Sequence, residues 1–137
     1  MRRQFPFRVQ KISIDAGKEF FRHKYPDMKY LAYFQAFSNT YATLDTLQRR
    51  YEEALSAEDV VGIVIGTRPD CVSDEILNYL ESLNQQTFMI VEYGIESVSD
   101  DTLRRVNRGH NFECSRRAII ETHNRGILTG AHIILGL

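Results

Sequence analysis

Four short apolar runs, separated by stretches of helical periodicity, constrain the fold of this chain more than any other feature. They cover residues 30–34, 60–65, 88–95 and 127–135, and they are rich in β-branched and aromatic residues. Nearly continuous apolar runs of this length are typical of strands that are buried on both faces of a parallel sheet. Their starts lie roughly 30 to 40 residues apart, which is the spacing of repeated β/α units.

Helix start and stop signals fill the stretches between these runs. Apolar residues at helical spacing predict a first helix over about 8–24, before the first run. Gly109 is expected to end the helix that follows the third run, and Gly126 to close a last helix over 112–125. The later helices each follow a residue that can cap a helix N-terminus: Thr43, Ser73, Ser99 and Asn111.

The expected order is α-β-α-β-α-β-αα-β. We therefore predict an α/β fold: a partial parallel (β/α) barrel of about four strands with flanking helices. The 137 residues suit a single domain over 1–137. Because a helix comes first and a strand-like run comes last, we expect an internal piece of a larger fold that lacks its first and last strands.

The composition indicates a globular protein with no strong global charge. Hydrophobic residues make up 43% and charged residues 26%, and the formal net charge of −1 draws the whole chain to neither nucleic acid nor membrane. No apolar run approaches the length of a membrane span or a signal peptide, so we expect a cytoplasmic protein without membrane contact. Cys71 and Cys114 lie too far apart for a metal-ligand spacing or a disulfide framework.

Polar side chains gather at the carboxyl ends of the four predicted strands. Ligands bind at these ends in parallel β/α folds, so the sequence predicts a ligand-binding rim there. The pattern alone does not identify the ligand. The rim candidates, in chain order, are Asn39, Thr40, Arg68, Asp70, Glu92, Glu96, Ser97, His132 and Gly136.

Structural roles compete with ligand binding at several of these positions. Polar groups inside a core are usually paired, and turn residues often bond only to their own backbone. The alternatives are a core-facing arginine partner for Glu92, a turn-stabilising pair for Arg68 and Asp70, a hydrogen-bonded core position for His132, and turn or cap chemistry for Asn39 and Thr40.

Three motifs in order carry a resemblance to a known family. The third run and the helix after it read EYGIES over 92–97, SDDTL over 99–103 and VNRGH over 106–110. They resemble radical S-adenosylmethionine (radical SAM) enzymes related to the Elongator catalytic subunit and to the oxygen-independent coproporphyrinogen oxidases. TRPD over 67–70 is similar to the end of the third strand in that group. YFQAFSNTY over 33–41 resembles an uncharacterised bacterial subfamily of the same group.

The resemblance implies that the chain binds the cofactor S-adenosylmethionine (SAM) along this rim. It places Asn39 and Thr40 near the amino group of the methionine part, although the glycines of the family motif are absent. Arg108 would meet the carboxylate, which suits a guanidinium fork. Gly136 opens a segment similar to the start of a GLPG motif near the adenine. The remaining residues of the implied cofactor set are Arg68, Glu96 and Ser97, with His132 near the ribose.

One departure from the family concerns the iron–sulfur cluster. The CxxxCxxC loop that holds a [4Fe–4S] cluster is missing, so the cluster is expected only in a full-length parent. There it would donate an electron to SAM, whose carbon–sulfur bond would break to give methionine and a 5′-deoxyadenosyl radical. This radical would abstract hydrogen from a substrate, with RNA and protein among the possible substrates. This chain alone is expected to be inactive, and its exposed sheet edges predict a homodimer.

The alternative function is a non-enzymatic α/β module that binds RNA or protein through arginine-rich helices. Such a module would show salt-sensitive RNA binding. The arginines concerned are Arg104, Arg105, Arg108, Arg116, Arg117 and Arg125.

Overall fold

The computed structural model describes residues 8–35 and 39–137, and it confirms the predicted order of elements. A short 3₁₀ turn, η1, is added after the second strand. The elements are α1 (Arg8–Arg22), β1 (Tyr30–Phe34), α2 (Leu44–Leu55), β2 (Val60–Thr67), η1 (Pro69–Cys71), α3 (Asp74–Asn84), β3 (Phe88–Glu96), α4 (Asp100–Arg105), α5 (Phe112–Asn124) and β4 (Leu128–Ile133).

The four strands form one parallel sheet in the order β1-β2-β3-β4, as the sequence predicted. One row of register partners runs from Tyr33 through Val64 and Ile90 to Leu128. Each strand therefore pairs with the next strand in the chain, with a helical connection between them. This order is that of a β/α barrel wall, whereas a doubly wound sheet reverses its order at a switch point.

Local sequence signals start the helices where they were predicted. The side chains of Thr43, Ser73, Ser99 and Asn111 each accept a hydrogen bond from the backbone N–H three residues ahead. These bonds satisfy donors that a helix N-terminus leaves without partners. Helix α5 ends at Asn124, and Gly126 closes it as expected, with a φ of 73° that suits glycine.

The end of α4 differs from the prediction. Asn107, not Gly109, adopts the left-handed conformation at the helix end, with a φ of 52°. Its N–H donates to the Arg104 carbonyl at 3.1 Å, and the Arg108 N–H donates to the Leu103 carbonyl at 3.0 Å. This pair of bonds is a Schellman motif, in which asparagine can replace glycine. Gly109, with a φ of 88°, serves the turn that follows.

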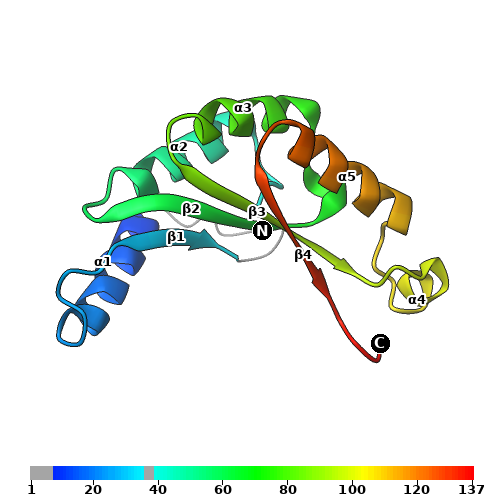
Figure 1. Cartoon of the computed structure of the whole chain (residues 1–137), viewed down its shortest axis with the longest axis horizontal. Coiled ribbons are helices and arrows are strands. Elements are labelled where there is room, and N and C mark those ends of the chain that lie inside the picture. The colour runs from blue at the N-terminus through cyan, green and yellow to red at the C-terminus, as the bar shows by residue number, and fades with distance from the viewer. Residues whose placement is uncertain (1–7, 36–38) are drawn as a thin grey trace.

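Helices α2, α3 and α5 lie along one face of the sheet, while α4 lies beyond the carboxyl end of β3 (Figure 1). Alternate strand residues and the apolar stripes of the helices form the core between these layers. The Tyr93 hydroxyl within it shares a hydrogen bond of 2.8 Å with Thr122 Oγ1, and burial raises the pKa of Tyr93 to about 12. Fully buried members include Leu47, Tyr51, Ile63, Ile65, Leu80, Met89, Val91 and Ile127.

The opposite face of the sheet, here called the open face, is largely exposed. Leu31 and Tyr33 of β1 are 43% and 49% exposed, although Ala32 and Phe34 between and beyond them are buried. Burial on both faces, expected from the apolar runs, is therefore found only in the middle of β2, where Ile63, Val64 and Ile65 are all buried. No described element covers the rest of the open face. The fourth strand also ends earlier than predicted, at Ile133.

Two glycine-to-alanine substitutions should change stability in opposite directions. At Gly62, an added Cβ would lie 2.4 Å from the Phe88 carbonyl oxygen in the neighbouring strand, whereas at Gly17 in α1 it would meet nothing within 4 Å. We expect Gly62→Ala to lower the free energy of unfolding by about 1–3 kcal/mol through overpacking. Gly17→Ala should raise it by about 0.5–1 kcal/mol through helix propensity. Urea denaturation of both variants tests this, and equal stability of Gly62→Ala and wild type would contradict the β2–β3 packing.

Candidate functional site

The carboxyl ends of all four strands border a single cleft of about 450 Å³, here called the rim cleft. The floor of the rim cleft lies on the open face of the sheet. The connection between α4 and α5 closes one side of the cleft. A volume of this size suits a small molecule. The lining residues are Tyr33, Gln35, Gly66, Thr67, Arg68, Glu92, Gly94, Glu96, Arg108 and His132.

Arg108 is held across the rim cleft by three groups. Its Nη2 donates to the Gly94 carbonyl at 2.7 Å and lies 3.1 Å from Glu96 Oε1, and its Nε donates to His110 Nε2 at 3.1 Å. The Schellman ending of α4 supplies this position, because Arg108 is the residue directly after Asn107. A Cβ on Gly94 would lie 2.9 Å from Nη2, so the guanidinium uses the space that glycine leaves.

Glu96 reaches Arg108 through an unusual backbone conformation. Its φ is 64°, which is rare for a residue other than glycine and is often found at functional sites. The pairing register between β3 and β4 also shifts between Gly94 and Glu96. The end of β3 therefore turns the Glu96 carboxylate toward the cleft. Ser97 beside it has a local role, since its Oγ accepts a hydrogen bond from the Ser99 N–H at 3.1 Å.

A carboxylate with two hydrogen-bond donors lies lower in the rim cleft. Glu92 Oε2 accepts from the Tyr33 hydroxyl at 2.7 Å and lies 3.0 Å from His132 Nε2. The bond from Tyr33, and then that from His132, hold the pKa of Glu92 below its ordinary value, while the same bond raises the pKa of Tyr33. The alternative of a core-facing arginine partner for Glu92 is therefore not found, and His132 stands on the open face rather than in the core.

Arg68 and Asp70 form the turn-stabilising pair that the sequence suggested. The Arg68 Nε and Nη2 donate to the two carboxylate oxygens of Asp70 at 2.9 and 2.7 Å. This fork lowers the pKa of Asp70. Arg68 still lines the rim cleft, so its structural pairing and its place at the site coexist.

Thr40 and Asn39 fasten the loop after β1 to its neighbours. The Thr40 hydroxyl is buried, donates to the Cys71 carbonyl at 2.6 Å and lies 2.7 Å from Thr67 Oγ1. Asn39 Oδ1 accepts from the Tyr51 hydroxyl at 3.0 Å. Neither residue lines the rim cleft, and neither do Ser97 and Gly136. Of the predicted set, the cleft gathers Arg68, Glu96, Arg108 and His132.

Sequence reasoning left several lining residues out of the predicted set. Tyr33 was assigned only to an apolar strand, but the alternation of residues along β1 places it on the same face as Leu31, opposite Ala32 and Phe34. That period of two was the available signal. Gly94 carries no side-chain chemistry, so only its position in the sheet reveals that it belongs to the cleft.

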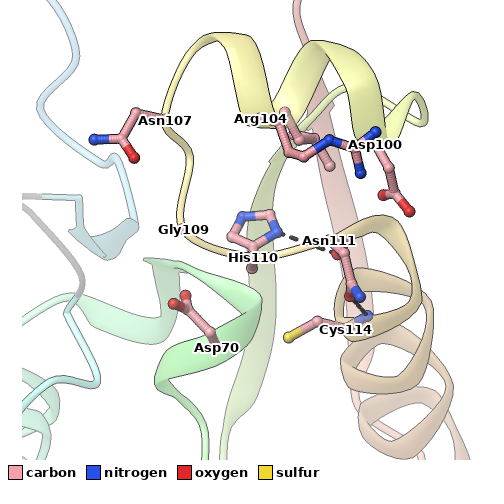
Figure 2. A pocket seen from close by; sticks show the side chains of 9 residues that line it. Asp70, Asp100, Arg104, Asn107, Gly109, His110, Asn111 and Cys114 are labelled. Atoms are coloured by element: carbon pink, nitrogen blue, oxygen red, sulfur yellow. Dashed lines mark hydrogen bonds between the residues drawn. The ribbon is translucent and has the colours of Figure 1, made fainter.

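A second cleft of about 610 Å³ lies between η1, α4 and the start of α5 (Figure 2). Its polar groups are largely committed to the local fold. Asp100 Oδ1 accepts from the Phe112 N–H at 2.7 Å, and Asn111 caps α5. Burial, the largest contribution, raises the pKa of Cys114, so its thiol is not activated.

Within 8–35 and 39–137, no group of three or more His, Cys, Asp or Glu side chains is placed to hold a metal ion.

Comparison with known proteins identifies relatives of this sequence. Residues 7–137 match the family model described as the radical SAM superfamily. The chain is 44% identical over 114 residues to the uncharacterized protein YtqA of Bacillus subtilis, covering 83% of this chain and 35% of that protein. It is 41% identical over 110 residues to protein YhcC of Escherichia coli K12, covering 80% of this chain and 36% of YhcC.

A third relative is archaeal. The chain is 38% identical over 110 residues to the uncharacterized protein MJ0486 of Methanocaldococcus jannaschii, covering 80% of this chain and 34% of MJ0486. The chain therefore spans about a third of the length of these relatives. No solved structure matches it significantly. Among the described residues, no helix has the length and apolar character needed to cross a membrane.

The Arg68–Asp70 pair should make stability depend on pH in a defined direction. Because the folded-state pKa of Asp70 is lowered, the pair stabilises the fold above the unfolded pKa of aspartate, and this contribution is lost as the pH falls through the lower folded value. We expect the wild type to exceed Asp70→Asn in free energy of unfolding by up to about 1 kcal/mol near neutral pH. The difference should vanish in acid. Urea denaturation at several pH values measures it, and a difference that persists in acid would contradict this assignment.

Proposed function

We propose that this chain, which belongs to the radical SAM superfamily, forms the part of a radical SAM enzyme core that binds S-adenosylmethionine. The observation that carries the proposal is the rim cleft, where two half-buried guanidinium groups, two carboxylates and an imidazole converge at the carboxyl ends of parallel strands. This edge is where β/α barrels bind their ligands.

The donor set of the rim cleft fits the polar groups of this cofactor. The Arg108 guanidinium is suited to a carboxylate, while Glu96 and Glu92 are suited to an ammonium group or to hydroxyl groups. Bare backbone at Gly94 and Gly130 makes room for the side chains of the site, since a Cβ would lie 2.9 Å from Arg108 Nη2 at Gly94 and 3.2 Å from Glu92 Cγ at Gly130. Together these features form a cradle that is polar at both ends.

When bound beside a reduced [4Fe–4S] cluster, SAM supplies hydrogen-abstracting radical chemistry. The residues of this chain would bind and orient the cofactor. A CxxxCxxC sequence is not found among the 137 residues, so we assign the cluster ligands to another part of the whole protein. The chain by itself is proposed to be inactive.

The motifs around β3 support a finer assignment within the superfamily. EYGIES includes the residues that build the lower cleft and the Glu96 turn, and VNRGH supplies Asn107, Arg108 and His110. We place the protein in the group related to the Elongator catalytic subunit and the oxygen-independent coproporphyrinogen oxidases. RNA and protein are the substrate classes proposed for it.

The alternative of an RNA-binding or protein-binding module receives less support. Carboxylates neutralise much of the positive charge on α4 and α5, as is typical of a solvated helix face. The pairs are Arg104 with Asp101, Arg116 with Glu113, Arg117 with Glu121, and Arg125 with Glu81 and Asp74.

Association of two copies remains a prediction. Within the described sheet, β1 and β4 are the edge strands, and each pairs on one side only. An unpaired strand edge can accept a further strand, which supports the proposal of a homodimer.

Calorimetric titration of SAM into the wild-type chain and Arg108→Ala tests the proposed function. We expect wild-type binding, and a loss of about 10- to 100-fold in the variant, because a charge-assisted hydrogen bond to the carboxylate is removed. Arg104→Ala is the matched control, since Arg104 is an exposed residue of α4 paired with Asp101 outside the rim cleft. Absence of wild-type binding, or equal affinity of the wild type and Arg108→Ala, would contradict the proposal.

A further inference from the structure

We infer that Glu92 is a positioning residue that sets the hydrogen-bonding direction of Tyr33 and His132, so that the floor of the rim cleft presents acceptors to its ligand. The inference depends on the proposed function only for the identity of the ligand. The role of Glu92 itself follows from contacts among three strands of the sheet.

The arrangement depends on glycine at both neighbouring positions. Glu92 in β3 is in register with Gly66 in β2 and with Gly130 in β4. Neither neighbour has a side chain, so Glu92 is approached freely from both sides. Tyr33 comes from β1, two strands away, and His132 comes from β4. Both contact the same atom, Glu92 Oε2, which brings their polar atoms close together.

An ionised carboxylate can only accept hydrogen bonds, so both partners must donate. Tyr33 uses its single O–H, which leaves the lone pairs of its oxygen available. When the His132 imidazole is neutral, this bond requires its proton on Nε2 and leaves Nδ1 as an acceptor. The bonds from Tyr33 and His132 keep the pKa of Glu92 below its ordinary value, so this direction persists at neutral pH. Tyr33 and His132 can each donate or accept a hydrogen bond, and their bonds to Glu92 leave them as acceptors toward the cleft.

The rim cleft is consequently polarised along its depth. Arg68 and Arg108 offer donors at its upper edge, whereas Tyr33 and His132 offer acceptors at its floor; Glu96 is the other titratable group in the lining. Such a cleft favours a ligand with an acidic group at one end and hydroxyl or ammonium donors at the other. A ligand that covers these partly exposed acceptors without donating to them would displace their water and leave them unpaired, which is costly.

His110 provides an internal comparison with the opposite proton position. Its Nε2 accepts from the Arg108 Nε at 3.1 Å, so its proton resides on Nδ1, which lies 3.3 Å from the Asn111 carbonyl oxygen. His110 and His132 are therefore expected to differ in tautomer, because a donor, Arg108, faces Nε2 of His110 and an acceptor, Glu92, faces Nε2 of His132.

Nitrogen-15 NMR of the imidazole side chains tests the role of Glu92 without any ligand. In the wild type we expect His132 to carry its proton on Nε2, with a visible, hydrogen-bonded N–H signal that the spectrum of His132→Asn identifies. Glu92→Leu should lose this signal to exchange with water, because the acceptor is gone. The Nδ1–H pattern of His110 should not change. A wild-type His132 protonated on Nδ1, or an Nε2–H signal that survives in Glu92→Leu, would overturn the inference.

Titration of SAM into the same samples extends the test to recognition. We expect Glu92→Leu to bind about tenfold more weakly, because two acceptors lose their orientation, and Tyr33→Phe to lose several-fold through a single acceptor. Unchanged SAM affinity in both variants would overturn the acceptor-floor inference. If the wild type fails to bind SAM, the proposed function fails for this chain, whereas the NMR result still decides whether Glu92 directs its neighbours.

Discussion

The parallel pairing of β2 with β3 determines which residues at the centre of the sheet face the site. Its register buries Ile65 and Val91 beneath the helices, and it leaves Gly66 and Glu92 side by side on the open face. Because strand residues alternate between faces, burying one row places the next row in the cleft. The packing of the apolar face thus sets the chemistry of the opposite face.

The end of α4 places Arg108 at the carboxyl edge of the sheet. The Schellman turn at Asn107 satisfies the last carbonyls of the helix and directs Arg108 back toward β3. There the guanidinium meets a backbone carbonyl, Glu96 and His110. The turn that satisfies the last backbone carbonyls of α4 therefore also brings Arg108 into the site. Gly94, which has no side chain, leaves room for the Arg108 guanidinium.

Much of the architecture could be predicted from the sequence. The apolar runs and the caps at Thr43, Ser73, Ser99 and Asn111 follow from local periodicity and local hydrogen bonding. The four strands and the four caps were found where expected, although the fourth strand is shorter than its apolar run. Gly109 was assigned the wrong role, because asparagine and glycine compete for a left-handed helix end and only the backbone path decides between them. Burial on both faces was also expected too widely, since an apolar run does not show what covers it.

The sequence by itself determined the elements, the α/β class and the carboxyl edge at which polar residues gather, because these depend on neighbours within a few positions along the chain. Only the tertiary structure decided which of those residues meet. Tyr33, Glu92 and His132 lie on three different strands, and their contact depends on register and on the bare positions at Gly66 and Gly130. Thr40 shows the converse, since a residue predicted for the site is buried and bonded to Cys71 and Thr67 instead.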